Sequence, residues 1–189
     1  VTHHASNLQS PTSNFHTGGP IFASPTITDV NHDGANELIA VSESLNVYAW
    51  SANGTPLPGW PRYIGDGVRS TPAIGDLDGN GDVEIMLGDN SGHLHAWHGD
   101  EPTAIVLPVA LGGAIKSSPV LANLDGQPGD EIVVHANDAR VYVLHGNGSF
   151  FPNWPQSTGG VTETFGSFII ASTPAVGDVD GDGTPEIVV

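Results

Sequence analysis

Four stretches of the sequence decide the fold: SPTITDVNHDGANELIAV at 24–41, TPAIGDLDGNGDVEIMLG at 71–88, SPVLANLDGQPGDEIVVH at 118–135 and TPAVGDVDGDGTPEIVV at 173–189. Their prolines follow one another at intervals of 47, 47 and 55 residues, and a glutamate near the end of each stretch keeps the same intervals. Self-similarity at a period of about 20 to 50 residues is the signature of a repeat architecture. We therefore interpret the chain as an array of one repeated unit.

Each repeat has the pattern of several short β-strands. The runs EIMLGD at 84–89 and EIVVHA at 131–136 are apolar and of strand length, whereas HLHAWH at 93–98 and RVYVLH at 140–145 alternate. Clusters of Gly, Asn, Asp and Pro separate these runs, and no amphipathic helix pattern is present. Four strands in such a unit make one blade of a propeller. The sequence predicts an all-β fold, a β-propeller of four-stranded blades with about 3.5 to 4 blades present.

The repeats also set the expected boundaries along the chain. We expect an N-terminal segment at 1–20, blade repeats at 21–68, 69–115 and 116–170, and the first half of a fourth repeat at 171–189. The third repeat is longer by eight residues, and a surface loop around 159–166 is expected to accommodate them. The last segment ends inside an apolar strand. This predicts part of a larger propeller, or a half-ring whose last blade is completed by the N-terminal segment or a neighbouring copy.

Composition excludes several classes of function. The 189 residues include 21 acidic and only four basic side chains, so the formal charge is −17. Such a chain lacks the basic surface that nucleic acids and anionic membranes require. No apolar run is long enough to span a membrane, and the first residues show no signal peptide. There is no cysteine, so disulfides and thiolate chemistry are also excluded, and the length suits one domain.

An acidic loop follows the first strand of each repeat. Oxygen-bearing side chains occupy positions one, three, five and nine, a glycine at position six permits the turn, and position seven offers a backbone carbonyl. The predicted metal ligands are Asp29, Asn31, Asp33, Ala35 and Glu37; Asp76, Asp78, Asn80, Asp82 and Glu84; and Asp178, Asp180, Asp182, Thr184 and Glu186. Several hard oxygen ligands without imidazole or thiolate favour calcium. We expect three calcium sites.

The third acidic loop departs from this pattern. Its candidate ligands are Asn123, Asp125, Gln127, Gly129 and Glu131, of which only two are carboxylates. We expect weak or absent calcium binding there. An EF-hand is excluded because its twelfth position needs a glutamate, and the other loops have Ala40, Leu87 and Val189 at that place. The remaining alternative is that the carboxylates form Asx-type turns and bind only backbone N–H groups.

These loops, in their strand-rich setting, resemble the FG-GAP or VCBS repeat family, whose blades carry a D-x-D-x-D-G loop as in the integrin α-subunit propeller. The resemblance covers about residues 20–189. It implies a calcium-stabilised β-propeller, found mostly in extracellular proteins and often beside a catalytic or adhesive domain. The repeated Trp-Pro pairs and the Asn-Gly turns at 53–54 and 147–148 resemble secreted bacterial versions more than integrins.

Two other groups of residues have both a functional and a structural interpretation. His93, His95 and His98 form H-x-H-x-x-H, and strand alternation puts the first two on one face, as a zinc site requires. The repeat register favours a packing or rim role instead, because tyrosines stand at the place of His95 in the neighbouring repeats. Four tryptophans offer sugar stacking or an inter-blade core, and their fixed repeat positions favour the core: Trp50, Trp60, Trp97 and Trp154.

Catalysis is not expected within this chain, because every convincing carboxylate cluster belongs to a repeated loop and an active site is normally built once. The leading hypothesis is a calcium-binding extracellular propeller module, secreted or at the cell surface, serving as a binding, adhesion or assembly scaffold for a protein or carbohydrate ligand. One alternative is a propeller part of a secreted polysaccharide-degrading enzyme or peptidase, which a single non-repeated polar cluster in a pocket would favour. Another is a structural subunit that polymerises by self-association through incomplete blades.

Overall fold

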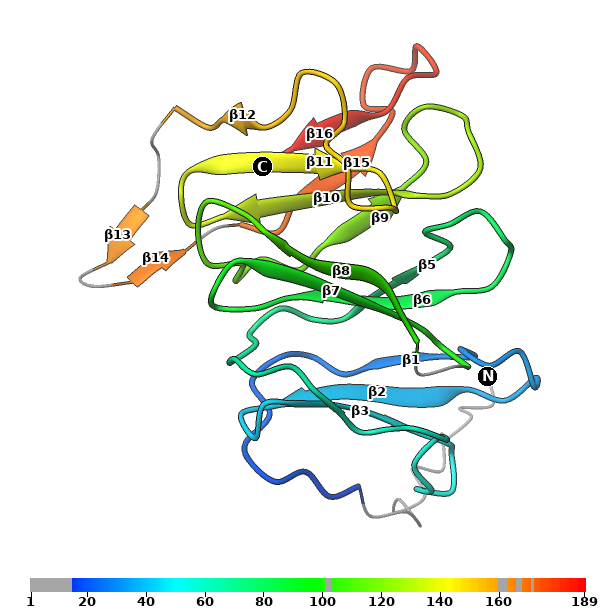
Figure 1. Cartoon of the computed structure of the whole chain (residues 1–189). Helices are drawn as coiled ribbons and strands as arrows, with labels where there is room; N and C mark the ends of the chain where they lie inside the picture. The colour runs from blue at the N-terminus through cyan, green and yellow to red at the C-terminus, as the bar shows by residue number, and fades with distance from the viewer. Residues whose placement is uncertain (1–14, 101–102, 160–162, 166–167, 171) are drawn as a thin grey trace, which may run out of the picture.

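The computed structural model describes residues 15–100, 103–159, 163–165, 168–170 and 172–189, and within these ranges it contains strands and turns but no helix. Three four-stranded antiparallel sheets follow one another along the chain (Figure 1). Their strands are β1 (Thr26–Thr28), β2 (Glu37–Ser42), β3 (Asn46–Trp50) and β4 (Arg62–Tyr63); β5 (Ala73–Gly75), β6 (Glu84–Gly88), β7 (His93–His98) and β8 (Ala104–Ala110); and β9 (Val120–Ala122), β10 (Glu131–Ala136), β11 (Arg140–Leu144) and β12 (Gln156–Ser157). The predicted four-stranded propeller blades are confirmed. No helix in the described ranges is long and apolar enough to cross a membrane.

The C-terminal part adds two hairpins. β13 (Glu163–Phe165) pairs with β14 (Phe168–Ile170), and β15 (Ala175–Gly177) pairs with β16 (Glu186–Val188), both antiparallel. The loop predicted around 159–166 is therefore partly a strand, because β13 lies within it. Of the N-terminal segment, residues 15–20 are described, and they lie against the first sheet: the N–H of Glu43 donates to the carbonyl of Pro20 at 2.9 Å. Residues 1–14 lie outside the described part of the chain.

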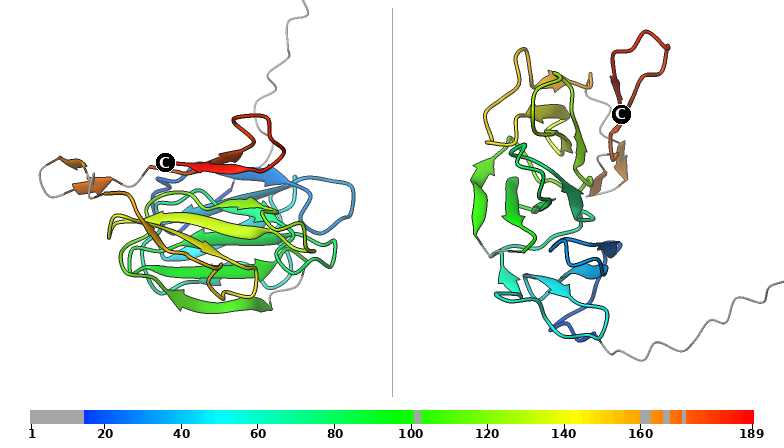
Figure 2. Two further views of the ribbon diagram at one scale, coloured as in Figure 1. Left: turned by 90° about the horizontal axis from the view of Figure 1, so that it is seen from above. Right: turned by 90° about the vertical axis from the view of Figure 1, so that its right-hand side faces the viewer.

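The sheets stand side by side in chain order, and their first strands meet (Figures 1 and 2). β5 contacts β9, and β9 contacts β15, as expected of the strands nearest a propeller axis. The Ser/Thr-Pro residues that start each repeat join neighbouring blades by hydrogen bonds. The N–H of Thr71 donates to Ser118 Oγ at 2.9 Å, and the N–H of Ser118 donates to Thr173 Oγ1 at 3.2 Å. The repeated Ser/Thr-Pro pair is thus a blade-to-blade connector.

The hydrophobic core lies between the sheets. Every residue of β6 and β10 is buried, which agrees with their continuous apolar pattern. Ile39 of the first sheet and Ile85 of the second share one core cluster with Trp60 and Trp97, whose rings meet edge to face at 6.0 Å. Trp154 packs against the cluster between the third sheet and the last hairpin. These tryptophans therefore belong to the inter-blade core, as the repeat register predicted.

Two glycines at matching repeat positions let one blade touch the acidic loop of the blade before it. A Cβ atom on Gly99 would overlap the carbonyl oxygen of Val30, and one on Gly146 would overlap that of Leu77. Both neighbours are backbone atoms, so they cannot move aside as a flexible side chain would. Val30 and Leu77 are the second residues of the first and second acidic loops. The loops are thus part of the blade-to-blade contact.

Candidate metal centres

The four acidic loops connect the first and second strands of successive repeats and lie at the same edge of the sheets (Figure 1). Their residue ranges are 29–36, 76–83, 123–130 and 178–185. The glycine at position six has φ of 87°, 92° and 90° at Gly34, Gly81 and Gly183, in the left-handed region that a side chain disfavours. This explains why the position is glycine in the loops with the full ligand pattern.

The glutamate at position nine fixes the start of each loop in the same way. One carboxylate oxygen, Oε2, accepts the N–H of the residue at position two. The four distances are 3.0 Å for Glu37 and Val30, 2.7 Å for Glu84 and Leu77, 2.7 Å for Glu131 and Leu124, and 2.8 Å for Glu186 and Val179. The first three glutamates are buried, and burial raises the pKa of Glu37 and Glu84 above its ordinary value.

The carboxylate at position one accepts backbone N–H groups from the same loop. Asp178 Oδ1 accepts from Gly181 at 2.7 Å, and its Oδ2 accepts from Gly183 at 2.9 Å. Asp76 makes both corresponding bonds, whereas Asp29 accepts from Gly34 through Oδ2 and from Asp33 through Oδ1. The Asx-type turns weighed from the sequence are therefore present. These turns do not use all the lone pairs of the carboxylates. Each carboxylate has about four lone-pair positions, and a metal ion can bind to those that accept no hydrogen bond.

The first loop contains a buried carboxylate oxygen that lacks a partner. Glu37 is 1% exposed, and its Oε1 atom has no hydrogen-bond partner although it is enclosed. Leaving such an oxygen unpaired is costly. The neighbouring ligand positions, Asp29, Asn31 and Asp33, offer carboxylate and amide oxygen atoms, while the amide nitrogen of Asn31 donates to Asp33 Oδ2 at 3.3 Å. This residue set fits a hard divalent cation, which would satisfy the orphaned oxygen.

The fourth loop brings its acidic ligands together most completely. Oxygen atoms of Asp178, Asp180 and Glu186 lie within 4.8 Å of one another. The N–H of Thr184 donates to Asp182 Oδ1 at 2.7 Å, which fixes the fifth position as well. All donors are oxygens, and the side chains are largely exposed to solvent. This arrangement also suits calcium, which binds six to eight oxygen ligands.

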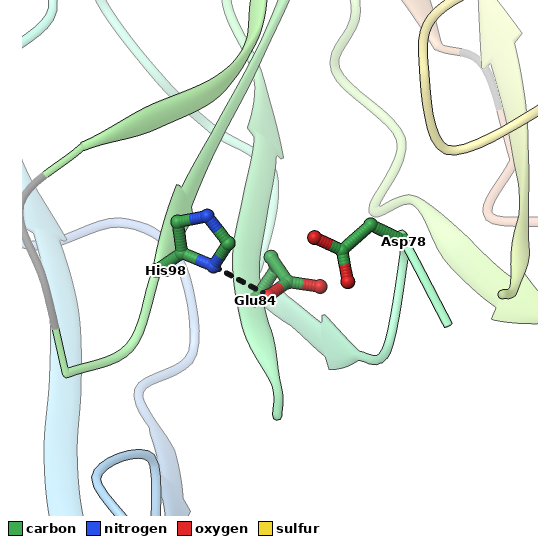
Figure 3. Close-up of side chains that lie close together, drawn as sticks. All are labelled: Asp78, Glu84 and His98. Atoms are coloured by element: carbon green, nitrogen blue, oxygen red, sulfur yellow. Dashed lines mark hydrogen bonds and ion pairs between the residues drawn. The ribbon is translucent and has the colours of Figure 1, made fainter. Parts of the chain in front are cut away.

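A histidine lies beside the glutamate of the second loop and another beside that of the third; from the sequence, His98 is a candidate only together with His93 and His95, and His145 is not a candidate. His98 Nδ1 lies 3.0 Å from Glu84 Oε1, and Asp78 faces the same carboxylate (Figure 3). His145 Nδ1 lies 3.1 Å from Glu131 Oε1. Both histidines stand 14 residues after the glutamate of position nine. That shared spacing is the signal in the sequence that points to the two histidine–glutamate pairs.

The third loop differs from the others because it packs on the second. The N–H of Asp130 donates to the carbonyl of Asp76 at 2.7 Å, and a Cβ on Gly79 would overlap Pro128. Within the loop, Asn123 Nδ2 donates to the carbonyl of Gln127 at 2.5 Å. An amide donor thus occupies the position where the other loops have a carboxylate. Weak calcium binding at this loop stays a prediction, and this contact is consistent with it.

A polar cleft of about 310 Å³ lies at the other end of β6 and β7, and its acidic and histidine residues are not repeated in the other blades. Asp89, only 2% exposed, accepts from His95 Nε2 at 2.9 Å and lies 3.4 Å from His93 Nδ1. Asp66 accepts from Ser91 Oγ, and hydrogen bonding lowers the pKa of this carboxyl. Tyrosines replace His95 in the first and third repeats.

These tyrosines have a structural role that His95 does not share. The hydroxyl of Tyr48 accepts the N–H of Gly18 at 3.1 Å, and that of Tyr142 accepts the N–H of Gly112 at 3.0 Å. Each bond fastens the segment that enters or leaves the blade. His95 pairs with Asp89 instead. The second blade therefore has a polar cluster at a place where the other blades have a hydrogen bond to the backbone.

Comparison with solved structures supports the propeller fold. The chain resembles the biofilm matrix protein Bap1 from V. cholerae, with 18% identity, a TM-score of 0.60, and coverage of 87% of this chain and 23% of that one. BBS1N in complex with ARL6DN is 16% identical with a TM-score of 0.57, and the match covers 91% of this chain and 48% of that one. BamB from Moraxella catarrhalis is 19% identical with a TM-score of 0.51, and the match covers 75% of this chain and 39% of that one. The chain thus spans less than half the length of each.

The repeats themselves match a known family. No curated protein sequence matches the chain. The sequence profile of the FG-GAP-like repeat matches residues 29–87 and 123–189. Together these ranges are more than half of the chain, and they include all four acidic loops. The chain belongs to the FG-GAP-like repeat family.

Proposed function

We propose that this chain is a calcium-stabilised propeller scaffold of an extracellular or cell-surface protein, which binds a protein or carbohydrate partner. The observation that carries the calcium assignment is the enclosed Glu37 Oε1, which lacks a partner in a loop of oxygen ligands. The family membership and the likeness to a biofilm matrix protein support the extracellular setting. The role of the metal is structural, since the loops form part of the contact between blades.

The residues of the loops have distinct tasks in this proposal. The position-nine glutamates hold the loop to the second strand through the N–H of position two, as at Glu186 and Val179. The position-one carboxylates, such as Asp178, shape the turn through backbone N–H groups. Their remaining oxygens, with those of positions three and five and the carbonyl of position seven, would hold calcium. The ion supplies positive charge where several carboxylates converge.

Replacement of one ligand tests this assignment loop by loop. We expect Asp178→Asn to remove one calcium ion from the binding stoichiometry, because it removes a charged ligand from the fourth loop while leaving the first and second loops intact. Isothermal titration calorimetry of calcium binding measures this. Asp100→Asn is the matched control, since it removes the same charge outside the loops and should leave the stoichiometry unchanged. Equal stoichiometry in Asp178→Asn and the parent protein would contradict the assignment.

The calcium-free protein should become more stable as the pH falls from about 7 to about 5. Burial raises the folded-state pKa of Glu37 and Glu84 above 4.5, so these carboxyls bind protons in the folded state at a higher pH than in the unfolded chain. The stabilisation is complete below the unfolded value and lost as the pH rises through the folded one. The lowered pKa of Asp66 acts only at lower pH, near 3.8 and below.

Melting temperatures of dialysed, calcium-free protein at several pH values measure this trend. Calcium should reverse it, because the ion binds ionised carboxylates and is released when they are protonated. Glu37→Gln should reduce the pH dependence in the absence of calcium, since it removes one of the carboxyls whose pKa is raised by burial, which also include Glu84 and Asp130. A calcium-free protein that loses stability steadily as the pH falls from 7 to about 5 would contradict a pKa raised by burial at these glutamates.

The cleft of Asp66, Asp89, His93 and His95 favours a second candidate, a propeller that belongs to a secreted polysaccharide-degrading enzyme or peptidase. It is a polar cluster built once, and the buried Asp89 holds His95 as an acid–base residue is commonly held. The test is hydrolysis or lysis of a panel of polysaccharides and peptides by the chain and by its His95→Tyr variant, which restores the residue of the other repeats. Turnover lost in this variant supports the candidate, and absence of turnover by the parent chain excludes it for this chain.

A further inference from the structure

We propose that Asp125, Glu131 and His145 form a binding site for a divalent transition metal ion of the zinc class, distinct in its ligand chemistry from the calcium loops. The three residues come from different parts of the third blade. Asp125 lies in the acidic loop, Glu131 begins β10, and His145 directly follows β11. One ligand atom of each lies within 4.8 Å of the other two, so a single ion can contact all three after small side-chain adjustments.

The separation of the two innermost ligands suits a small tetrahedral ion. His145 Nδ1 and Glu131 Oε1 are 3.1 Å apart. Zinc bonds of about 2.0 to 2.1 Å in tetrahedral geometry place neighbouring ligands about 3.4 Å apart. A calcium ion has longer bonds and needs six or more oxygen ligands. The observed pair therefore needs little change to receive zinc, with the imidazole presenting an unprotonated Nδ1 to the ion.

The ligand set of this loop selects against calcium and for a transition metal. Imidazole nitrogen is a preferred ligand of zinc, copper and nickel, whereas calcium prefers oxygen. The third loop has two carboxylates at its ligand positions, and the amide of Asn123 is committed to the carbonyl of Gln127. The third loop is thus the poorest of the four in hard oxygen ligands, and His145 lies next to it.

Neighbouring groups hold the glutamate and the histidine in place. Glu131 is 4% exposed, and its Oε2 accepts the N–H of Leu124 at 2.7 Å, which leaves Oε1 next to His145. The imidazole of His145 lies against the ring of Phe151, with 5.0 Å between ring centres. Such outer contacts orient metal ligands and strengthen binding. The positions of Glu131 and His145 relative to each other are therefore fixed by contacts to each of the two side chains.

The cluster is reachable from solvent. A cleft of about 480 Å³ is lined by all three residues, together with Gln127, Asn147 and other residues of the second and third blades. An ion held by three protein ligands at the wall of a cleft keeps a fourth position for water or for a group on a partner. The site is therefore suited to metal exchange and to metal-mediated contact with another molecule.

The neighbouring repeats provide an internal comparison. Asp78, Glu84 and His98 form the same trio in the second repeat, with the same spacing (Figure 3). The first repeat has Ser51 at the place of the histidine, and there Glu37 Oε1 lacks a partner. Histidine thus occurs next to the buried glutamate in two repeats and is replaced in a third. In the second repeat the trio shares Asp78 and Glu84 with the predicted calcium site, so the third repeat is the cleaner case.

Zinc titration of calcium-saturated protein tests the proposal. We expect the parent protein to bind zinc, His145→Ser to bind it at least about 100-fold more weakly, and the control His16→Ser, which changes an exposed histidine outside the cluster, to bind it normally. Serine is the residue of the first repeat at this register. Asp125→Asn, a substitution at an exposed loop position, should cause a similar loss and serves as the second variant if His145→Ser does not fold.

A spectroscopic measurement separates ligation from a structural effect. Cobalt bound to the parent protein should give the visible absorption of a four-coordinate ion, and His145→Ser should lack this absorption while keeping its calcium stoichiometry. Zinc binding of equal affinity in parent and His145→Ser, or no zinc binding by the parent, would overturn the proposal. Either result would leave the calcium assignment standing, because that is measured by calcium stoichiometry alone.

Discussion

Removal of calcium is expected to lower the melting temperature of this protein by about 15 °C or more. A ligand present at about 100 times its dissociation constant stabilises the folded state by about 2.7 kcal/mol per site, so three sites contribute about 8 kcal/mol. For a chain of this size each kcal/mol changes the melting temperature by about 2 to 4 °C. The three sites are those of the first, second and fourth loops.

Calcium removal should destabilise more than the separate loops, because loops of neighbouring blades contact one another. His32 of the first loop lies 3.1 Å from the Asp82 carboxylate of the second, and Asp130 of the third donates to Asp76 of the second. Calorimetry in excess chelator and in excess calcium measures the shift. Magnesium is the control ion, because it demands octahedral geometry with shorter bonds and should stabilise less. Identical melting curves in chelator and calcium would contradict a structural role of the metal.

Replacement of Gly146 by alanine is the single substitution with the largest expected cost, about 3 kcal/mol or more. The new Cβ would overlap the carbonyl oxygen of Leu77, which belongs to the acidic loop of the preceding blade. Relief requires the second and third blades to separate, which also disturbs the packing between their sheets. The melting temperature should fall by several degrees, and the calcium affinity of the second loop should fall with it.

A matched glycine provides the control. Gly177 has free space around its Cβ position and no left-handed φ, so Gly177→Ala should change the melting temperature little. Chemical denaturation of both variants with calcium present measures the difference in the free energy of unfolding. A Gly146→Ala protein as stable as Gly177→Ala would mean that consecutive blades do not depend on this close backbone approach.

Much of the fold could be predicted from the sequence because the repeated unit occurs several times in it. The period, the apolar second strand and the position-six glycine recur, so the blade could be predicted without any single strong motif. The hairpin of β13 and β14 could not, because the extra residues of the third repeat have no counterpart in the others. Local patterns there indicated a loop, while the backbone pairs Thr164 with Ile169.

The candidate sites were likewise predictable only in part. The oxygen ligands were predictable because their spacing lies within one short loop. The pairing of His98 and His145 with the loop glutamates could not be predicted, because a strand separates each histidine from its loop. Only the pairing of the second and third strands brings each imidazole to its glutamate. The cleft at His95 was visible only as a departure from a repeated tyrosine. Its significance depends on Asp89, which belongs to the turn before the same strand.

A crystal structure of the calcium-soaked protein, with anomalous scattering used to locate the ions, is the decisive measurement for the calcium sites. We expect calcium in the first, second and fourth loops, with oxygen ligands at about 2.3 to 2.6 Å. Glu37 Oε1 should be among the ligands of the first ion, since it is the enclosed oxygen without a partner. Loops that stay free of metal in excess calcium, with Glu37 Oε1 bound only to protein or water, would contradict calcium binding by these loops.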